Sequence, residues 1–260
     1  MMDEFKGYAL PMDEEGFTQV TEQLGVGAPE LWALLTVETK GCGFLSDRRP
    51  VILFERHIFS RETGSRYDVS NPDISNPSWG GYGPGGAAQY ERLNKAIALD
   101  RIAALKSTSW GIGQVMGFNA ETAGYGDVEV MVKAMTFSEN EHLKALTGEI
   151  MHNKLDGALR SHNWANFARG YNGPAYAENK YDTRLASAYQ KFVQGPLPDL
   201  TVRAAQVYLL YLGYNPGHVD GVTGRFTYSA LNEFQRANNL PVMNAINPDV
   251  LASLEAKVLI

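Results

Sequence analysis

The sequence predicts a mostly helical α+β fold in two domains, a large one followed by a small one. Helical spacing of apolar residues dominates from Gln89 onward. One strand-like run, Val51 to Phe59, follows Pro50 and is rich in β-branched and aromatic residues. The segment from Gln194 to Asp199 contains two prolines and a glycine, which end a helical run and mark the domain boundary.

The helices of the large domain follow from the spacing of its apolar residues. We expect a first helix that contains Leu31 to Glu38, and further helices over residues 90–106, 127–146, 148–160 and 180–193. The glycine-rich stretch WGGYGPGG at residues 79–86 precedes the last four of these helices and is predicted to be an irregular loop. It lacks the Gly-Lys-Ser/Thr ending of a phosphate-binding loop, so it does not indicate nucleotide binding.

The small domain is expected to be three short helices around one core. Their apolar faces are Leu200, Ala204, Val207 and Tyr211 or Leu212; then Ala230, Leu231 and Phe234; then Val250, Leu251 and Leu254. We therefore divide the chain into a domain of residues 1–194, a linker of residues 195–199 and a domain of residues 200–260.

The composition argues against several classes of function. A formal net charge of −6 is unlike a nucleic-acid-binding protein, which needs a basic surface. The single cysteine, Cys42, excludes an internal disulfide framework. The five histidines form no His-Glu-x-x-His motif and no other zinc-binding pattern. We expect neither a metal nor a cofactor.

The sequence predicts neither a membrane span nor a secretory signal. No run of 18 or more apolar residues occurs. Residues Met1 to Lys6 do not form a basic region followed by an apolar one. We therefore expect a monomer that does not insert into a membrane and that stays in the cytoplasm until another protein releases it.

Glu38 is the first candidate catalytic group. Three leucines between Leu31 and Leu35 precede it at the spacing i, i+3 and i+4, and Glu38 itself stands at i+7, on the core-facing side of the helix end. Burial and the negative end of the helix dipole both raise a carboxyl pKa, as a general acid requires. The alternative is that Glu38 reaches solvent or pairs with Arg48 or Arg49.

Glu55 is the second candidate. In a strand over residues 51–59, alternate residues share one face, which places Glu55 between Leu53 and His57 on a largely apolar face. Two carboxylates at core-facing positions suit a glycosidase pair on either side of a cleft. The alternative is that Glu55 forms a buried ion pair with a nearby arginine.

Three blocks of sequence resemble the N-acetylmuramidase domain of many endolysins from phages that infect Gram-negative hosts. The blocks are Glu38 with Gly41 and Gly43, followed by Leu53-Phe54-Glu55-Arg56-His57; Ser109 to Gly117 (SWGIGQVMG); and Phe167 to Gly173 (FARGYNG). They occur in that family's order, and the resemblance extends over about residues 17–193.

This resemblance implies a lysozyme-like fold in which Glu38 is the proton donor. It implies that Glu55 assists, either as a base or by stabilising positive charge on the sugar. It also implies a substrate-binding set made of Ser109, Trp110, Gln114, Tyr171 and Asn172. Amide groups suit the N-acetyl and hydroxyl groups of the substrate, and a flat ring suits a sugar face.

Residues 203–254 resemble the common three-helix peptidoglycan-binding module. The match includes Leu212-Gly213-Tyr214, Asp220-Gly221, Ala230-Leu231 and Phe234-Gln235. The segment from Asp220 to Gly224 lacks the alternating ligands of a calcium loop, so we interpret it as a turn.

Together, the resemblances imply an endolysin: a hydrolase that cleaves the β-1,4 bond between N-acetylmuramic acid and N-acetylglucosamine of peptidoglycan. Such a protein leaves the host cytoplasm through a holin-type pore and lyses the host cell from the periplasm. Because every candidate cleft residue precedes the linker, a chain that ends near Gln194 is expected to cleave soluble peptidoglycan by itself.

Two alternative functions stay open at this point. One is a lytic transglycosylase on the same fold, in which the muramoyl 6-hydroxyl replaces water and one carboxylate suffices. The other is a non-catalytic wall-binding protein of a virion. The second carboxylate, Glu55, favours hydrolysis.

Overall fold

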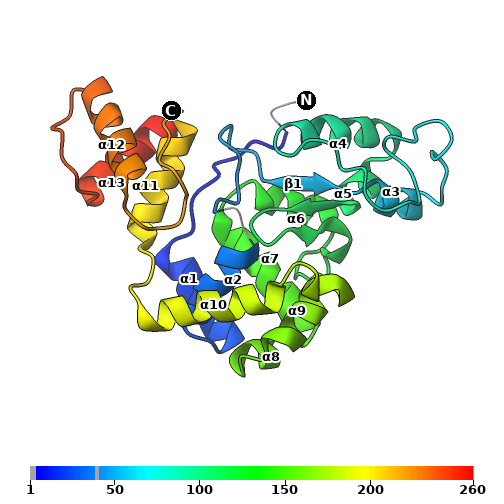
Figure 1. The fold of residues 1–260 in the computed structure, drawn as a ribbon. Helices are drawn as coiled ribbons and strands as arrows, with labels where there is room; N and C mark the ends of the chain where they lie inside the picture. Colours follow the sequence, from blue (N-terminus) through cyan, green and yellow to red (C-terminus); the bar gives the residue numbers. More distant parts are fainter. Residues whose placement is uncertain (1–3, 39–40, 260) are drawn as a thin grey trace. The chain divides into compact units, whose positions relative to one another are not determined.

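The computed structural model describes residues 4–38 and 41–259, with Glu38 described by its backbone alone. This part of the chain is mostly helical and carries one small sheet, as the α+β prediction requires (Figure 1). The chain forms two compact units, and each is described by itself. The first comprises the described residues of Met1–Ala9, Gly43–Leu45 and Arg49–His152; the second comprises those of Leu10–Cys42, Ser46–Arg48 and Asn153–Ile260.

The first unit holds the sheet. Its elements in chain order are β1 (Ile52–Phe54), α3 (Arg56–Glu62), α4 (Ala88–Leu99), α5 (Arg101–Lys106), β2 (Thr108–Trp110), β3 (Val115–Met116), the 3-10 helix η1 (Gly117–Asn119), α6 (Val128–Met135) and α7 (Glu139–His152). The strands pair antiparallel in the order β1-β2-β3, with Ile52 opposite Trp110 and Trp110 opposite Val115. The SWGIGQVMG block is therefore a β-hairpin, which helical spacing did not predict.

Aromatic side chains fill the core of this unit. Phe54, Trp110 and Tyr90 are each at most 1% exposed. The polar atoms of two of these rings make hydrogen bonds within the unit. The Trp110 indole donates to the Leu105 carbonyl at 3.2 Å, and the Tyr90 hydroxyl donates to the Pro50 carbonyl at 2.7 Å. The end of β1 is thus fixed against a packed core.

The predicted strand over residues 51–59 is wrong in its second half. β1 ends at Phe54, and Glu55 stands at the N-cap of α3. The buried strand residues are Ile52 and Phe54, so the core face is the opposite of the one predicted. The partner strand β2 is only three residues long, and beyond it the consecutive residues Ile58, Phe59 and Ser60 are all buried, which does not follow the alternation of a strand with one buried face.

The boundaries of the other predicted helices of this unit differ at capping residues. The helix predicted over residues 90–106 is interrupted at Asp100, whose side chain accepts a hydrogen bond from the Ala103 amide and starts α5. Asp127 starts α6 in the same way. The helix α7 continues to His152, across the predicted boundary between residues 146 and 148.

The second unit is helical throughout its regular elements. These are α1 (Glu14–Leu24), α2 (Ala28–Glu38), α8 (Asp156–Arg160), α9 (Trp164–Asn172), the 3-10 helix η2 (Pro174–Ala177), α10 (Tyr181–Gln194), α11 (Leu200–Tyr211), α12 (Arg225–Ala237) and α13 (Pro248–Val258). The long helix α10 packs against both α2 and α9. The helix α2 ends at Glu38, as predicted.

The predicted leucine stripe of α2 is buried, but it is not the only buried side of the helix. Leu31, Leu34 and Leu35 are at most 4% exposed, and Trp32 and Val37 are buried as well. The surrounding helices therefore enclose α2 on nearly every side.

The last three helices share one small core, as predicted (Figure 1, yellow to red). The predicted face of α11 is wrong, because Ala205, Tyr208 and Leu209 enter this core in place of Leu200, Ala204 and Val207. Ala205 and Leu209 of α11, Leu231 and Phe234 of α12 and Leu254 of α13 belong to one hydrophobic cluster. The chain bends at Asp220 and Gly221, where both backbone amides donate to the Gln206 side chain. None of the helices described is long and apolar enough to cross a membrane.

Candidate active site

Glu55 lies at the junction of β1 and α3. Its amide donates to the Ser107 carbonyl at 2.9 Å, which continues the pairing of β1 past the last strand residue. The carboxyl side chain is 18% exposed. Burial raises the pKa of the Glu55 carboxyl, and a hydrogen bond with Tyr82 partly offsets that rise. Glu55 therefore stays a candidate, and it stands at the start of a helix instead of within a strand.

Tyr82 comes from the glycine-rich loop, which sequence reasoning treated only as a connection. Burial, together with the charge of Glu55, raises the pKa of Tyr82 to about 12. The phenol therefore keeps its proton at neutral pH and donates it in a hydrogen bond to the Glu55 carboxylate. A tyrosine within a run of glycines was the available sequence signal.

A buried glutamine orders this loop. The Gln89 side chain accepts a hydrogen bond from the Phe54 amide at 3.0 Å and donates to the carbonyls of Tyr82 and Pro84, both at 2.7 Å. Gly81, with φ +70°, lies against the Arg56 guanidinium, and a Cβ atom there would be 2.5 Å from the Arg56 Cζ. The loop is therefore tied to the end of β1 and requires glycine where it crosses Arg56.

One aromatic residue, His57, lies next to the Glu55 carboxylate, and a second, Trp79, contacts the rings of His57 and Tyr82. The His57 Nδ1 atom is 3.4 Å from Glu55 Oε2. Burial, followed by the charges of Arg61 and Arg56, lowers the pKa of His57, so its ring is neutral at neutral pH and this contact is not an ion pair. The Trp79 side chain is 76% exposed, and its ring lies edge-on to those of His57 and Tyr82. Sequence reasoning missed Trp79.

We expect Tyr82→Phe to move the acid limb of the pH–rate profile to higher pH. The Tyr82 hydrogen bond lowers the Glu55 pKa, so its loss raises that pKa further and leaves less ionised Glu55 at a given pH. The profile of kcat against pH for soluble glycan strands measures this. A limb that stays in place, or moves to lower pH, would mean that an ionised Glu55 does not limit the rate.

The three predicted substrate-binding residues of the hairpin are largely committed to the fold. Trp110 is completely buried, so its indole has no surface from which to contact a saccharide. Ser109 is 4% exposed and donates to the Gln114 amide oxygen at 3.0 Å. The Gln114 amide nitrogen donates to the carbonyls of Gly111 and Val51 at 2.7 and 3.2 Å. We conclude that Trp110 is a core residue and that Ser109 and Gln114 brace the hairpin beside Glu55.

A buried histidine holds the hairpin turn. His142 Nδ1 accepts from the Ile112 amide at 3.2 Å, so the proton is on Nε2, which donates to the Met135 carbonyl at 2.7 Å. Gly111 has φ +69°, and a Cβ atom there would lie 2.6 Å from the His142 ring. The Trp-Gly pair of the block is thus explained by packing.

The remaining predicted site residues belong to the second unit. The backbone of Glu38 closes α2, and its carboxylate lies outside the described residues. Tyr171 and Asn172 form the C-terminal end of α9, where both are partly exposed. The Tyr171 ring stacks on the buried Phe167 ring, with centroids 5.6 Å apart and planes 11° apart.

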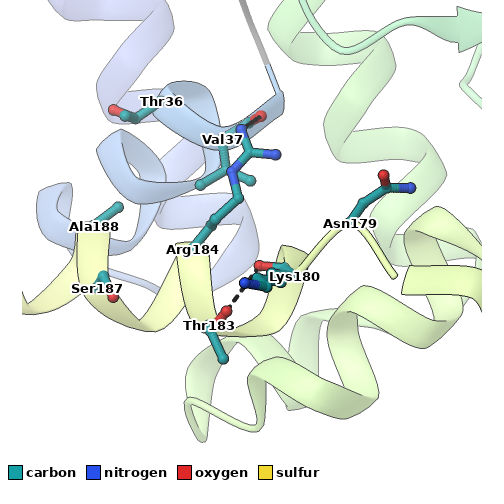
Figure 2. Close-up of a pocket in the computed structure, with 8 residues that line it drawn as sticks. All are labelled: Thr36, Val37, Asn179, Lys180, Thr183, Arg184, Ser187 and Ala188. Atoms are coloured by element: carbon teal, nitrogen blue, oxygen red, sulfur yellow. Dashed lines mark hydrogen bonds between the residues drawn. The ribbon is translucent and has the colours of Figure 1, made fainter. Parts of the chain in front are cut away.

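An open pocket of about 420 Å³ lies beside the end of α2, immediately before Glu38. Its lining residues are Thr36, Val37, Asn179, Lys180, Thr183, Arg184, Ser187 and Ala188. Figure 2 shows the Arg184 side chain extending from α10 toward Val37. The guanidinium donates to the Val37 carbonyl at 3.1 Å and so holds the chain one residue before Glu38. Sequence reasoning missed Arg184, because its partner is a backbone atom.

Within residues 4–37 and 41–259, no three His, Cys, Asp or Glu side chains gather where they could hold a metal ion.

Comparisons with known proteins identify two families in the chain. Residues 27–193 match the Muramidase family model, described as N-acetylmuramidase, and residues 199–254 match a putative peptidoglycan binding domain. The crystal structure of the Burkholderia AP3 phage endolysin is 41% identical, with a TM-score of 0.66, over 70% of this chain and 71% of that chain. No curated protein matches the chain. These findings confirm both resemblances: the chain belongs to the N-acetylmuramidase family of glycoside hydrolases and carries a peptidoglycan-binding domain behind its muramidase domain.

Proposed function

We propose that this protein is a phage endolysin that hydrolyses the β-1,4 bond between N-acetylmuramic acid and N-acetylglucosamine. Membership of the muramidase family supports peptidoglycan glycan strands as the substrate. The peptidoglycan-binding domain supports action on the insoluble cell wall. The observation that carries the reaction type is the half-buried Glu55 carboxylate, held by Tyr82 beside an exposed indole. A protein that only binds the wall has no need of such a group.

In the proposed mechanism Glu38 is the general acid. As the general acid, its carboxyl group enters the reaction carrying a proton. Glu38 donates this proton to the glycosidic oxygen as the bond to the muramic acid carbon breaks. The new hydroxyl group departs with N-acetylglucosamine.

In the proposed mechanism Glu55 acts as an ionised carboxylate. It accepts a proton from the attacking water, or it stabilises the positive charge that develops on the sugar ring. Tyr82 favours this ionised form by donating a hydrogen bond to it. The neutral His57 contributes no positive charge that would compete with the sugar for Glu55.

We propose that substrate is contacted mainly by residues whose side chains are at least partly exposed. Trp79 presents an exposed flat ring near Glu55, and such rings pack against sugar faces. Tyr171 and Asn172 remain proposed substrate ligands at the end of α9. Ser109 and Gln114 remain proposed substrate ligands. To bind substrate, they must exchange the hydrogen bonds that they make within the hairpin for bonds to the sugar.

The domain organisation is part of the proposal. A muramidase domain of residues 1–194 and a linker of residues 195–199 precede a wall-binding domain of residues 200–260, which raises the effective concentration of enzyme at the wall. We propose that the monomer is released from the host cytoplasm to the periplasm through a holin-type pore. It then acts there without inserting into a membrane or binding nucleic acid.

Addition of the pure protein to permeabilised Gram-negative cells tests this function. We expect the turbidity of the suspension to fall and soluble saccharide to appear. Protein that sediments with the cells while turbidity stays constant would instead support the non-catalytic wall-binding reading.

A further inference from the structure

The wall-binding domain contacts the chain that follows Glu38, and all of these contacts lie within the second unit. The Arg203 guanidinium of α11 donates to the Gly41 carbonyl at 2.6 Å. Gly41 has φ +103°, and a Cβ atom there would lie 2.9 Å from the Val219 carbonyl oxygen. Arg48 donates to the Val258 carbonyl at the end of α13, at 3.0 Å. Gly41 and Arg48 are therefore both in contact with the wall-binding domain.

The burial of α11 agrees with this contact. The face of α11 that enters the small hydrophobic core carries Ala205, Tyr208 and Leu209. On the opposite face of the helix, Arg203 is 2% exposed and Val207 is fully buried. A surface helix of a three-helix domain commonly has one buried stripe, and the burial of Arg203 on a second side of α11 agrees with its bond to Gly41 outside the domain.

Two arginines thus hold the backbone on either side of Glu38. Arg184, from α10, binds the Val37 carbonyl one residue before Glu38, and Arg203, from the wall-binding domain, binds the Gly41 carbonyl three residues after it. Hydrogen bonds from a charged donor are stronger than neutral ones, especially where the donor is buried. The two bonds fix the backbone carbonyls of Val37 and Gly41.

We propose that Arg203 is a positioning residue for Glu38, so that the wall-binding domain completes the active site as well as holding the substrate. This rests on the proposed role of Glu38 as the general acid. A displacement of about 1 Å in a catalytic group costs on the order of 100-fold in rate. The contact also changes an expectation from the sequence, because a chain that ends near Gln194 lacks Arg203 and is now expected to be slow on soluble peptidoglycan as well.

The test compares full-length Arg203→Met with the wild-type chain on soluble, uncross-linked glycan strands. Because these strands are not anchored, the rate does not depend on wall binding. We expect kcat to fall by about tenfold or more while KM stays within about twofold and co-sedimentation with sacculi is unchanged. Arg236→Met is the matched control, since Arg236 is exposed on α12, and it should leave kcat unchanged. A wild-type kcat in folded Arg203→Met would overturn the proposal.

Two further measurements keep the test decisive. Hydrogen exchange should rise in peptides from residues 36–45 of Arg203→Met but not in those from α12. If exchange rises in α12 too, the substitution has unfolded the domain, and Arg203→Lys then carries the test. Lysine keeps the charge and can donate a hydrogen bond to the Gly41 carbonyl, so we expect normal sedimentation and a kcat restored toward that of the wild type. A low kcat in folded Arg203→Lys, with hydrogen exchange of residues 36–45 unchanged, would refute the proposal. A wild-type protein that cleaves no glycan would instead refute the proposed function.

Discussion

Glu38→Gln is expected to abolish lytic activity while leaving the fold unchanged. The amide keeps the shape of the carboxyl group but has no acidic proton to give to the glycosidic oxygen. General acid catalysis contributes roughly 100-fold or more, so the release of reducing ends from soluble glycan strands should fall at least that far. The unfolding temperature should stay close to that of the wild type, because the helix α2 is held by its buried leucines.

The control for this variant is Glu30→Gln on the same helix. Glu30 is in the first turn of α2 and pairs with His162 at 2.7 Å. The same change of carboxylate to amide there should leave the rate near that of the wild type. If Glu38→Gln retains more than about a tenth of the wild-type rate, another group donates the proton.

Glu55→Gln should also reduce the rate strongly, by roughly 100-fold, because the amide can neither accept a proton from water nor balance the charge on the sugar. Binding to sacculi should be unchanged. Initial rates on soluble strands and co-sedimentation with sacculi measure the two properties separately.

Glu149→Gln provides the matched control for that variant. Burial raises the pKa of Glu149 too, and its side chain accepts a hydrogen bond from Asn119 at 2.9 Å. Both carboxyl groups are therefore desolvated and hydrogen-bonded, but only Glu55 has a proposed role in the reaction, so Glu149→Gln should leave the rate near that of the wild type. Near-normal turnover in Glu55→Gln would favour the transglycosylase reading, in which one carboxylate suffices.

Helical periodicity predicted much of this fold. The end of α2 at Glu38 and the core around Phe234 and Leu254 depend on spacing within a few turns of one helix, which a single sequence contains. The strand around Glu55 was predicted too long because its length is set by β2, more than fifty residues later. Pairing partners of that kind are not visible in local spacing.

The surroundings of the candidate site were less predictable for the same reason. Tyr82, Gln89 and Arg203 act through hydrogen bonds to groups that are distant in sequence or are backbone atoms. Trp110 shows the opposite case. Its place in a family block suggested contact with substrate, whereas its indole is buried and bonded to the Leu105 carbonyl. Residue type indicates which chemistry is available, and packing decides which side chains reach the surface.

Mass spectrometry of the muropeptides that the wild-type protein releases from sacculi tests the central claim most directly. Hydrolysis adds water across the glycosidic bond, so we expect products that end in a reducing N-acetylmuramic acid. In a transglycosylase the muramoyl 6-hydroxyl takes the place of water. No water is added, so each product is one water molecule lighter. Release of 1,6-anhydro products in place of reducing ends would contradict hydrolysis.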